Sequence, residues 1–329
     1  RDLHSFPTRR SSDLEPDIYV ANVCLEKLEE SSALTPSVKH SLIGEVKFIR
    51  AFCYFYLVNL FGDVPLAVTS DYRVNAILPR ATTTEVYLQI IADLLEAADD
   101  LPSTYTGLDR ARPNKWAALA LLARAYLYTG EWIKAEAAAS SVISSGMYIL
   151  PTDLNTTFLK PSIEAIWQLQ PVNSSWNTWE GREFLPPGNA ATPTYILHHA
   201  LLSAFEANDH RKTAWIGTLN YLGQDFYYPN KYKVYGNNAP VTEYYVVLRL
   251  AEQLLIRAEA RARQNKLEDS KADLNIVRTR AGLPDVIAAD EASLLSAIEN
   301  ERRIELLAEW GHRWFDLKRT NKEIGRAHV

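Results

Sequence analysis

Two segments far apart in the chain share one helix–turn–helix pattern, and this pattern most constrains the fold. Residues 116–128 and 132–143 predict two helices joined by a turn at Thr129-Gly130-Glu131. Residues 250–262 and 267–281 repeat the arrangement around a turn at 264–266. Small alanines in the first pair let its helices approach closely. Because such pairs bury their faces only by stacking on neighbours, the chain is expected to build a mostly helical scaffold.

Both pairs resemble tetratricopeptide-type repeats, and Ala-Arg-Ala-Tyr in the first aligns with Arg-Ala-Glu-Ala in the second. Residues 45–61 are too apolar for a surface helix and predict a buried one, which Gly62-Asp63-Val64-Pro65 ends. A helix over 86–98 is expected to begin at the cap Thr82-Thr83-Thr84-Glu85. The predicted fold class is therefore mostly α, with tetratricopeptide-like repeats.

Residues 150–245 lack this periodicity. Proline, glycine and asparagine become frequent, apart from short apolar runs at 164–169 and 244–248. About a hundred residues without long elements inside a compact protein indicate a functional, loop-rich subdomain.

The segment 300–319 predicts a single helix, with Ile304, Leu307, Trp310 and Trp314 at helical spacing on one side. Glu309 and Arg313 stand four residues apart and predict an exposed or half-exposed ion pair on it. Trp310, Trp314 and Phe315 are expected to anchor this helix, while Asp316 and the arginines satisfy buried polar groups.

Composition excludes several classes of function. The net charge of -5 gives no electrostatic reason to bind nucleic acid, and no run approaches the ~20 apolar residues of a membrane helix. Cys24 and Cys53 lie in apolar helical patterns and are expected to be small core residues. No spacing predicts a metal site, and no cofactor is expected.

Both ends of the chain look foreign to it. Residues 4–14 and 323–329 match translated sequencing adapters. We therefore expect the chain to be an open reading frame from a short assembled fragment, with artefacts at 1–14 and 323–329. The expected organisation is a helical scaffold at 15–149, a loop-rich ligand-binding subdomain at 150–245, and the C-terminal part of the scaffold at 246–322.

Several segments, in order along the chain, resemble the SusD/RagB family of outer-membrane nutrient-binding lipoproteins. The match rests on the helix 45–61 with its Gly-Asp-Val-Pro exit, the helix 113–127, the segments 248–260 and 274–283, and the ending Arg313-Trp-Phe-Asp-Leu317. Smaller landmarks are Ala204-Phe205-Glu206, Asp209, Arg211 and Lys231-Tyr232. The family's lipidated N-terminal cysteine has no counterpart, because Cys24 does not follow a hydrophobic signal core.

The resemblance implies a surface-exposed lipoprotein of the outer membrane in a Bacteroidetes-type bacterium. It implies capture of an oligosaccharide, or less often a peptide, and delivery to a SusC-like TonB-dependent transporter. The membrane would be reached through an N-terminal lipid anchor missing from this fragment. No enzymatic activity is implied.

Two other classes of function stay open. An intracellular tetratricopeptide scaffold would suit the bare repeats but not the long aromatic-rich insertion. A hydrolase would need two carboxylates separated by a sugar ring. The available acids (Asp99-Asp100, Glu29-Glu30 and Glu301 with Glu305) lie in helical or turn patterns where solvated charge is expected, and His312 has no nucleophile or orienting carboxylate beside it in sequence.

Sugars stack on flat aromatic rings, and polar side chains meet their hydroxyls. Three aromatic segments with polar neighbours are therefore the candidate ligand contacts, against the alternative that their rings pack inward. Their members are Trp176, Asn177, Trp179 and Arg182 in the first, Tyr227 and Tyr228 in the second, and Asp71, Tyr72, Arg73 and Asn75 in the third.

Overall fold

A computed structural model gives the fold and describes residues 11–107, 109–172, 177–188, 192–236 and 240–322. The described residues divide into two compact units, one up to residue 144 and one from residue 145 onward. The predicted organisation into 15–149, 150–245 and 246–322 stays a prediction.

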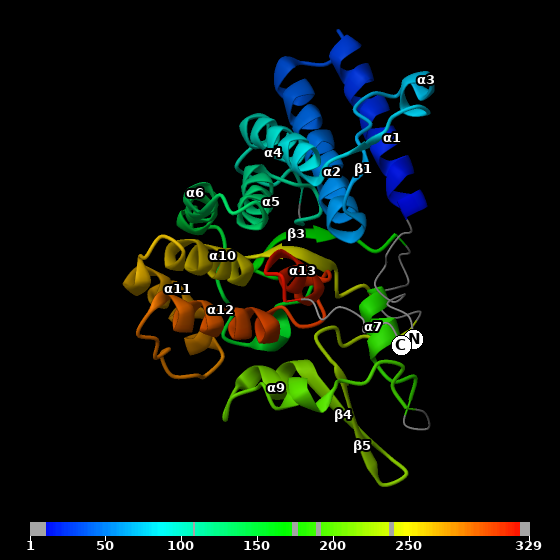
Figure 1. The fold of residues 1–329 in the computed structure, drawn as a ribbon. Helices are drawn as coiled ribbons and strands as arrows, with labels where there is room; N and C mark the ends of the chain where they lie inside the picture. Colours follow the sequence, from blue (N-terminus) through cyan, green and yellow to red (C-terminus); the bar gives the residue numbers. More distant parts are fainter. Residues whose placement is uncertain (1–10, 108, 173–176, 189–191, 237–239, 323–329) are drawn as a thin grey trace. The chain divides into compact units, whose positions relative to one another are not determined.

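The first unit is a succession of antiparallel helices, seen from blue to green in Figure 1. Each long helix packs on the next one along the chain. Their bounds are α1 Ser11–Glu30, α2 Pro36–Phe61, α4 Thr83–Asp100, α5 Lys115–Tyr128 and α6 Trp132–Ser144. The helices predicted at 45–61, 86–98, 116–128 and 132–143 are thus confirmed.

The predicted ends of these helices are also confirmed. Gly62 ends α2 with a φ of 73°, and its N–H donates to the carbonyl of Val58. Thr82 and Glu85 form a capping box at the start of α4. Between them, β1 Val64–Pro65 pairs with β2 Arg80–Ala81, and the short helix α3 Tyr72–Asn75 lies in the intervening loop.

The core of this unit is apolar and contains a buried ion pair. The α5 alanines at 117, 118, 120, 123 and 125 are fully buried, as their small size predicts. The Arg50 guanidinium on α2 binds both oxygens of Asp93 on α4, at 2.6 and 2.8 Å, and also donates to Asn22 on α1. Cys53 is buried, Cys24 is partly buried, and both are free thiols.

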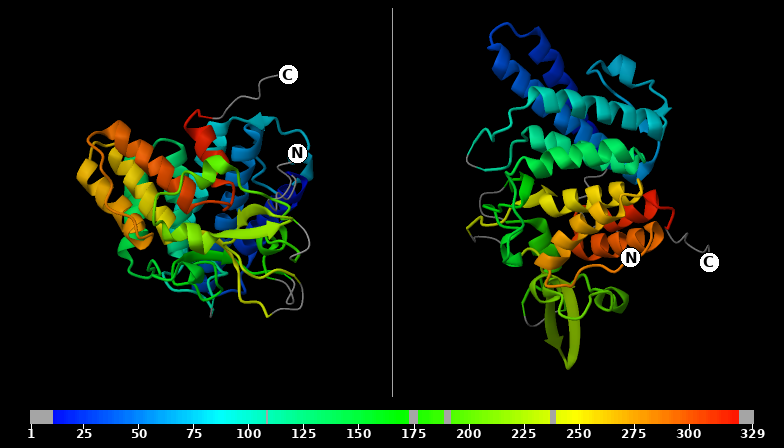
Figure 2. Two further views of the ribbon diagram at one scale, coloured as in Figure 1. Left: turned by 90° about the horizontal axis from the view of Figure 1, so that it is seen from below. Right: turned by 90° about the vertical axis from the view of Figure 1, so that its left-hand side faces the viewer.

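The second unit combines helices with two small antiparallel sheets. Strand β3 Ala165–Leu169 pairs with β6 Tyr245–Arg249, and β4 Ile216–Tyr221 pairs with β5 Gln224–Pro229 in a hairpin. The predicted second helix pair is confirmed as α10 Leu250–Ala262 and α11 Leu267–Arg280, which pack on α12 Glu291–Glu305 (Figure 2). The remaining elements are α7 Trp179–Phe184, α8 His199–Leu202, α9 His210–Trp215, α13 His312–Arg319 and a 3-10 turn at Leu154–Thr156.

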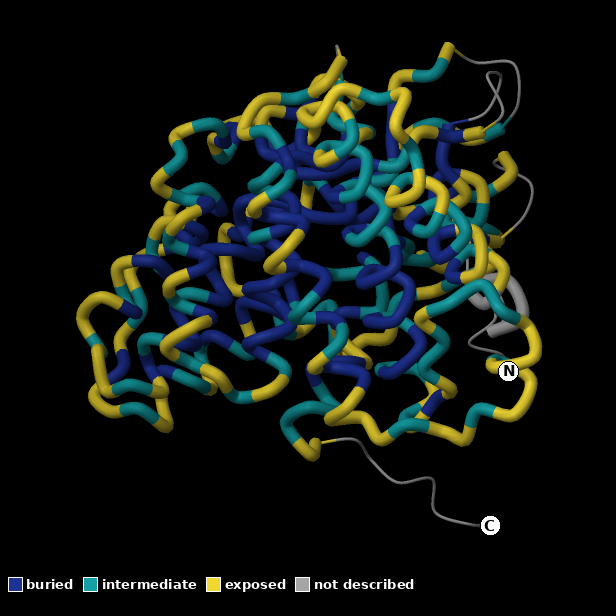
Figure 3. The backbone as a smooth tube through the Cα atoms, turned by 90° about the horizontal axis from the view of Figure 1, so that it is seen from above, coloured by how far each residue is buried: buried dark blue, intermediate teal, exposed yellow. Residues whose placement is uncertain are grey.

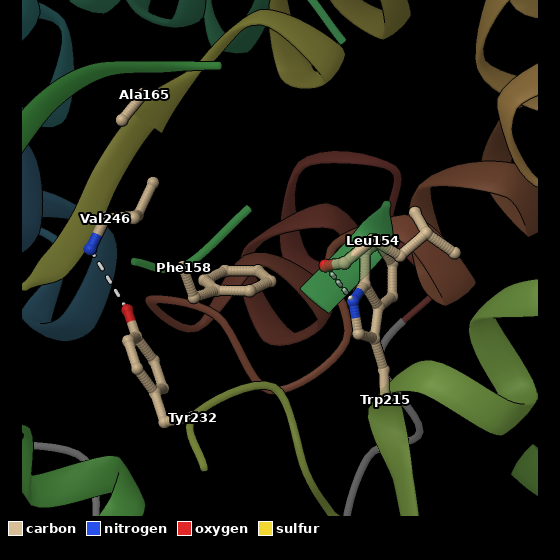
Figure 4. Packing of buried hydrophobic residues seen from close by; sticks show 6 residues of the cluster. All are labelled: Leu154, Phe158, Ala165, Trp215, Tyr232 and Val246. Carbon is tan, nitrogen blue, oxygen red and sulfur yellow. Dashed lines mark hydrogen bonds between the residues drawn. The ribbon is translucent and has the colours of Figure 1, made fainter. Parts of the chain in front are cut away.

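An aromatic cluster packs between the β3–β6 sheet on one side and α9 on the other. Phe158 meets Trp215 edge to face, and Tyr232 lies 5.2 Å from Phe158 between ring centroids. The polar atoms of both neighbours are satisfied: Trp215 Nε1 donates to the carbonyl of Leu154, and Tyr232 Oη accepts from the N–H of Val246 (Figure 4). Figure 3 colours the buried parts of the backbone dark blue.

The single helix predicted over 300–319 is wrong. Helix α12 ends at Glu305, and α13 begins at His312 after a turn in which Ala308, Trp310 and Gly311 have φ values of 54°, 40° and 75°. The carbonyl of Glu305, which a continuing helix would bond internally, instead accepts from Lys231 Nζ and from an Arg249 Nη, both at 2.7 Å.

The predicted pair of Glu309 and Arg313 is wrong for the same reason. Glu309 is buried and binds Arg249, whereas Arg313 reaches Glu299 at 3.5 Å. Trp314, expected on the apolar side, is 42% exposed. Phe315 is buried and Trp310 donates to the carbonyl of Val246, so these two do anchor the segment. Asp316 accepts from Arg302 and Arg319, as predicted.

Candidate functional site

Helix α7 presents an aromatic ring and a cation side by side at the surface. Trp179 is 44% exposed, and the guanidinium carbon of Arg182 lies 5.2 Å from the centre of its ring. A half-exposed indole beside an exposed cation can stack on a sugar face and donate to its hydroxyls. Trp176, predicted to join this site, lies outside the described residues.

Three contacts fix α7 in place. Thr178 caps it by accepting from the N–H of Gly181, and the N–H of Trp179 donates to Tyr245 Oη at 3.0 Å. At Gly181 the helix backbone meets the carbonyl of Val234 so closely that a Cβ atom would stand 2.4 Å from the oxygen. Only glycine fits there, so the position of Trp179 depends on this approach.

Asn177 holds the neighbouring segment rather than facing solvent. It is 3% exposed, its Nδ2 donates to the carbonyl of Pro240, and its Oδ1 accepts from the N–H groups of Thr242 and Glu243 at 2.8 and 2.9 Å. We therefore correct its role from ligand contact to support of the 240–243 backbone, because its amide is already engaged.

Glu180, between the two exposed residues, turns inward. It is 7% exposed and its Oε2 accepts no hydrogen bond. Burial raises the pKa of Glu180 to about 7; a hydrogen bond with its own backbone opposes this rise, and the nearby Glu243 carboxylate adds to it. Sequence reasoning missed this residue because a Glu between two candidate contacts gives no local sign of burial.

The tyrosines of β5 lie on opposite faces of the hairpin. Tyr227 packs against the buried cluster of Phe205, Ile216 and Ile304. Tyr228 lies over its cross-strand partner Gly217 and is partly buried. The strand-like alternative weighed for this segment describes Tyr227 well, since its ring contributes to the core.

The third candidate belongs to the first unit. Asp71 caps α3 and binds Arg73 through Nε at 3.0 Å and Nη2 at 2.8 Å, while Tyr72 is 75% exposed. Asn75 donates to the carbonyl of Thr69, and its Oδ1 has no partner. Glu26 and Asn22 on α1 fix this loop through Ser70, Thr69 and Ala67. The loop thus presents an ordered tyrosine and guanidinium.

The sequence prediction that Glu301 and Glu305 are solvated is wrong. Both are buried, and Glu305 is bound by Arg211, Arg249 and Arg280. Burial alone would raise the pKa of Glu305, yet the charges of these arginines hold it well below its ordinary value.

The same network extends to other elements of the unit. Arg249 also binds Glu164 at 2.8 Å, and Arg211 binds Asp209 and Glu301. A signal was present: Glu301 and Glu305 stand four residues apart, so both lie on one side of α12. Acids with this spacing can lie on a buried face when arginines elsewhere pair with them.

Within the residues that the structure describes, no group of three or more His, Cys, Asp or Glu side chains is arranged to hold a metal ion. None of the helices described combines the length and apolarity that a membrane crossing requires.

Sequence models of two related families match the chain. The one described as "Starch-binding associating with outer membrane" matches residues 15–127, and the one described as "SusD family" matches residues 176–327. SusD-like protein P25 of Formosa agariphila is 27% identical, over 93% of this chain and 69% of its own.

Solved structures agree with these matches. A SusD superfamily protein from Parabacteroides distasonis is 28% identical with a TM-score of 0.81, covering 94% of this chain and 74% of its own. A laminarin-binding SusD-like protein is 27% identical with a TM-score of 0.79, covering 94% and 76%.

Proposed function

Because this chain belongs to the SusD/RagB family, whose members include starch- and glycan-binding proteins associated with the outer membrane, we propose that it captures an oligosaccharide at the cell surface. The captured glycan would pass to a TonB-dependent transporter of the same membrane, with the chain held there by an N-terminal lipid anchor. Binding is non-catalytic and needs no cofactor.

The observation that carries the proposal is the exposed pair of Trp179 and Arg182 on a helix that its own cap and contacts with Tyr245 and Val234 hold in place. A rigid ring loses little conformational freedom on binding, so stacking on it is efficient. The exposed Tyr72 and Arg73 of the α3 loop offer the same chemistry in the first unit. We propose both as glycan contacts, with Tyr228 a weaker candidate because its ring is partly buried.

The test is a binding panel by isothermal titration calorimetry, with soluble starch and laminarin as the first probes. Starch is the ligand named for the family that matches residues 15–127, and laminarin is the ligand of one of the similar solved structures. We expect a glycan of the panel to bind, and Trp179→Ala to weaken that binding at least tenfold.

Trp314→Ala is the matched control, because Trp314 is exposed to almost the same extent, 42% against 44%, on a different helix. It should leave the affinity unchanged. Equal affinity of the Trp179→Ala and Trp314→Ala proteins would remove α7 from the site, and failure of every glycan to bind would turn the search to peptides.

An intracellular scaffold is the alternative class. A pull-down with a SusC-like TonB-dependent transporter, compared with a tetratricopeptide-binding peptide library, separates the two. Capture of the transporter supports the surface role, and binding of peptides alone supports the scaffold.

A further inference from the structure

Helix α7 has two faces of opposite character. Trp179 and Arg182 are exposed, whereas Glu180 between them is 7% exposed and points into the unit. One oxygen of this carboxyl, Oε2, has no hydrogen-bond partner. A buried carboxylate left without a partner is costly, and a buried carboxylic acid much less so.

The described groups around Glu180 offer it no counter-ion. From the segment before β6 comes Glu243, a second acid, and from β6 comes Tyr245. Tyr232 is also close to Glu180, but its hydroxyl accepts from the N–H of Val246. On α7 itself, Arg182 lies over Trp179, and Glu183 is a third acid that is partly exposed.

Lys233, which follows Tyr232 in the chain, also has other partners. Lys233 Nζ donates to the carbonyls of Ala214 and Asn230, and the charge of Lys233 acts on Glu243. The carboxylate of Glu243 in turn accepts from the N–H groups of Lys233 and Val234, at 2.6 and 3.3 Å. Val234 is the residue whose carbonyl touches α7 at Gly181. A second carboxyl, that of Glu243, therefore lies where α7 is seated, and burial raises its pKa as well.

We propose that Glu180 is a proton-controlled latch: α7 stays docked when this carboxyl is protonated and loosens when it ionises, so that pH sets how firmly Trp179 and Arg182 are held. The regulatory consequence for ligand capture rests on the function proposed above. The latch itself does not depend on that function.

The direction of the effect follows from linkage. The pKa of Glu180 is about 7 with α7 docked, against an ordinary 4.5 for a solvated carboxyl, so the docked state holds the proton more tightly. Docking is strongest below about pH 4.5, weakens as pH rises from there to about 7, and is constant above it. Capture at α7 is therefore firmer in mildly acidic medium.

Hydrogen–deuterium exchange of the full chain tests the latch without any glycan. The readout is the set of N–H groups bonded within the helix, at Gly181, Arg182 and Leu185. After correction for intrinsic exchange, we expect their opening to increase roughly fifty-fold between pH 5.0 and 7.5. Amides of α10, in the same unit, should show no such increase and serve as the internal reference.

Glu180→Gln keeps the shape of the protonated acid and should abolish the increase. Glu183→Gln, on the same helix but partly exposed, should retain it. If Glu180→Gln does not fold, Glu180→Leu takes its place with the same expectation. A flat pH response in the unsubstituted chain, or an equal response in the Glu180 variants, overturns the latch. Neither result bears on whether a glycan binds.

Discussion

Tyr228 lies directly over Gly217, its partner on the neighbouring strand, so that a Cβ atom at position 217 would stand 2.2 Å from Cζ of the tyrosine ring. The ring packs on the backbone of Gly217, in the space that a side chain at position 217 would occupy. This pair fixes the register of the β4–β5 hairpin, because a shift by one residue would place the ring over a side chain.

Gly217→Val should therefore destabilise the protein by about 1–3 kcal/mol, the usual cost of overpacking a close contact. Urea unfolding measures this change. Thr218→Val, at the next position of the same strand where the side chain is exposed, is the control and should be neutral. Equal stability of the Gly217→Val and unsubstituted proteins would show that Tyr228 is free to leave the backbone.

Glu305→Gln should have a larger effect. It removes the charge that Arg211, Arg249 and Arg280 share and leaves them buried with too few partners. The expected loss is about 3–5 kcal/mol of unfolding free energy. Glu299→Gln, which alters the exposed pairs with Arg313 and Lys322, should cost less than about 1 kcal/mol. A loss of under 1 kcal/mol in Glu305→Gln would contradict the central role of this residue.

Acid should destabilise the second unit through the same group. The folded pKa of Glu305 lies well below its ordinary value of 4.5, so its contribution is complete above pH 4.5. That contribution is lost as pH falls from 4.5 through the folded pKa. Urea midpoints measured from pH 7 to pH 3 should fall steeply below 4.5, and less steeply in Glu305→Gln. Parallel curves would exclude Glu305 as the source.

Asn177→Ala should act on stability first. Its Oδ1 accepts from the N–H groups of Thr242 and Glu243, which would be left without that partner. The expected cost is about 1–3 kcal/mol. Asn220→Ala, which breaks only an exposed bond to Asp225, is the matched asparagine control. Full stability with weakened glycan binding would instead restore Asn177 as a direct contact.

Tyr72→Ala should leave stability almost unchanged and act on glycan binding instead. The side chain is 75% exposed, so stability should change by less than about 0.5 kcal/mol. Affinity for the bound glycan should fall at least threefold if the α3 loop contacts it. Tyr19→Ala, an exposed tyrosine of α1, is the control. Unchanged affinity in both would confine binding to the second unit.

The sequence by itself determined several of the helices and some of their ends. Periodicity located α4, α5, α6, α10 and α11, and the residues at Gly62 and Thr82 fixed a stop and a start, because these signals act within a few residues. The motifs that carry the family resemblance are of the same local kind.

Only the tertiary structure decided where the charges of the C-terminal segment lie. Glu305 and Glu309 meet Arg249, some 60 residues away, and the turn that breaks the predicted helix follows from that meeting. It likewise decided that Trp179 is exposed and that Glu180 beside it is buried. The residues next to an acid in the sequence do not show whether its carboxylate is solvated or buried. The difference lies in which distant side chains and backbone groups surround it, since these set its desolvation and its partners.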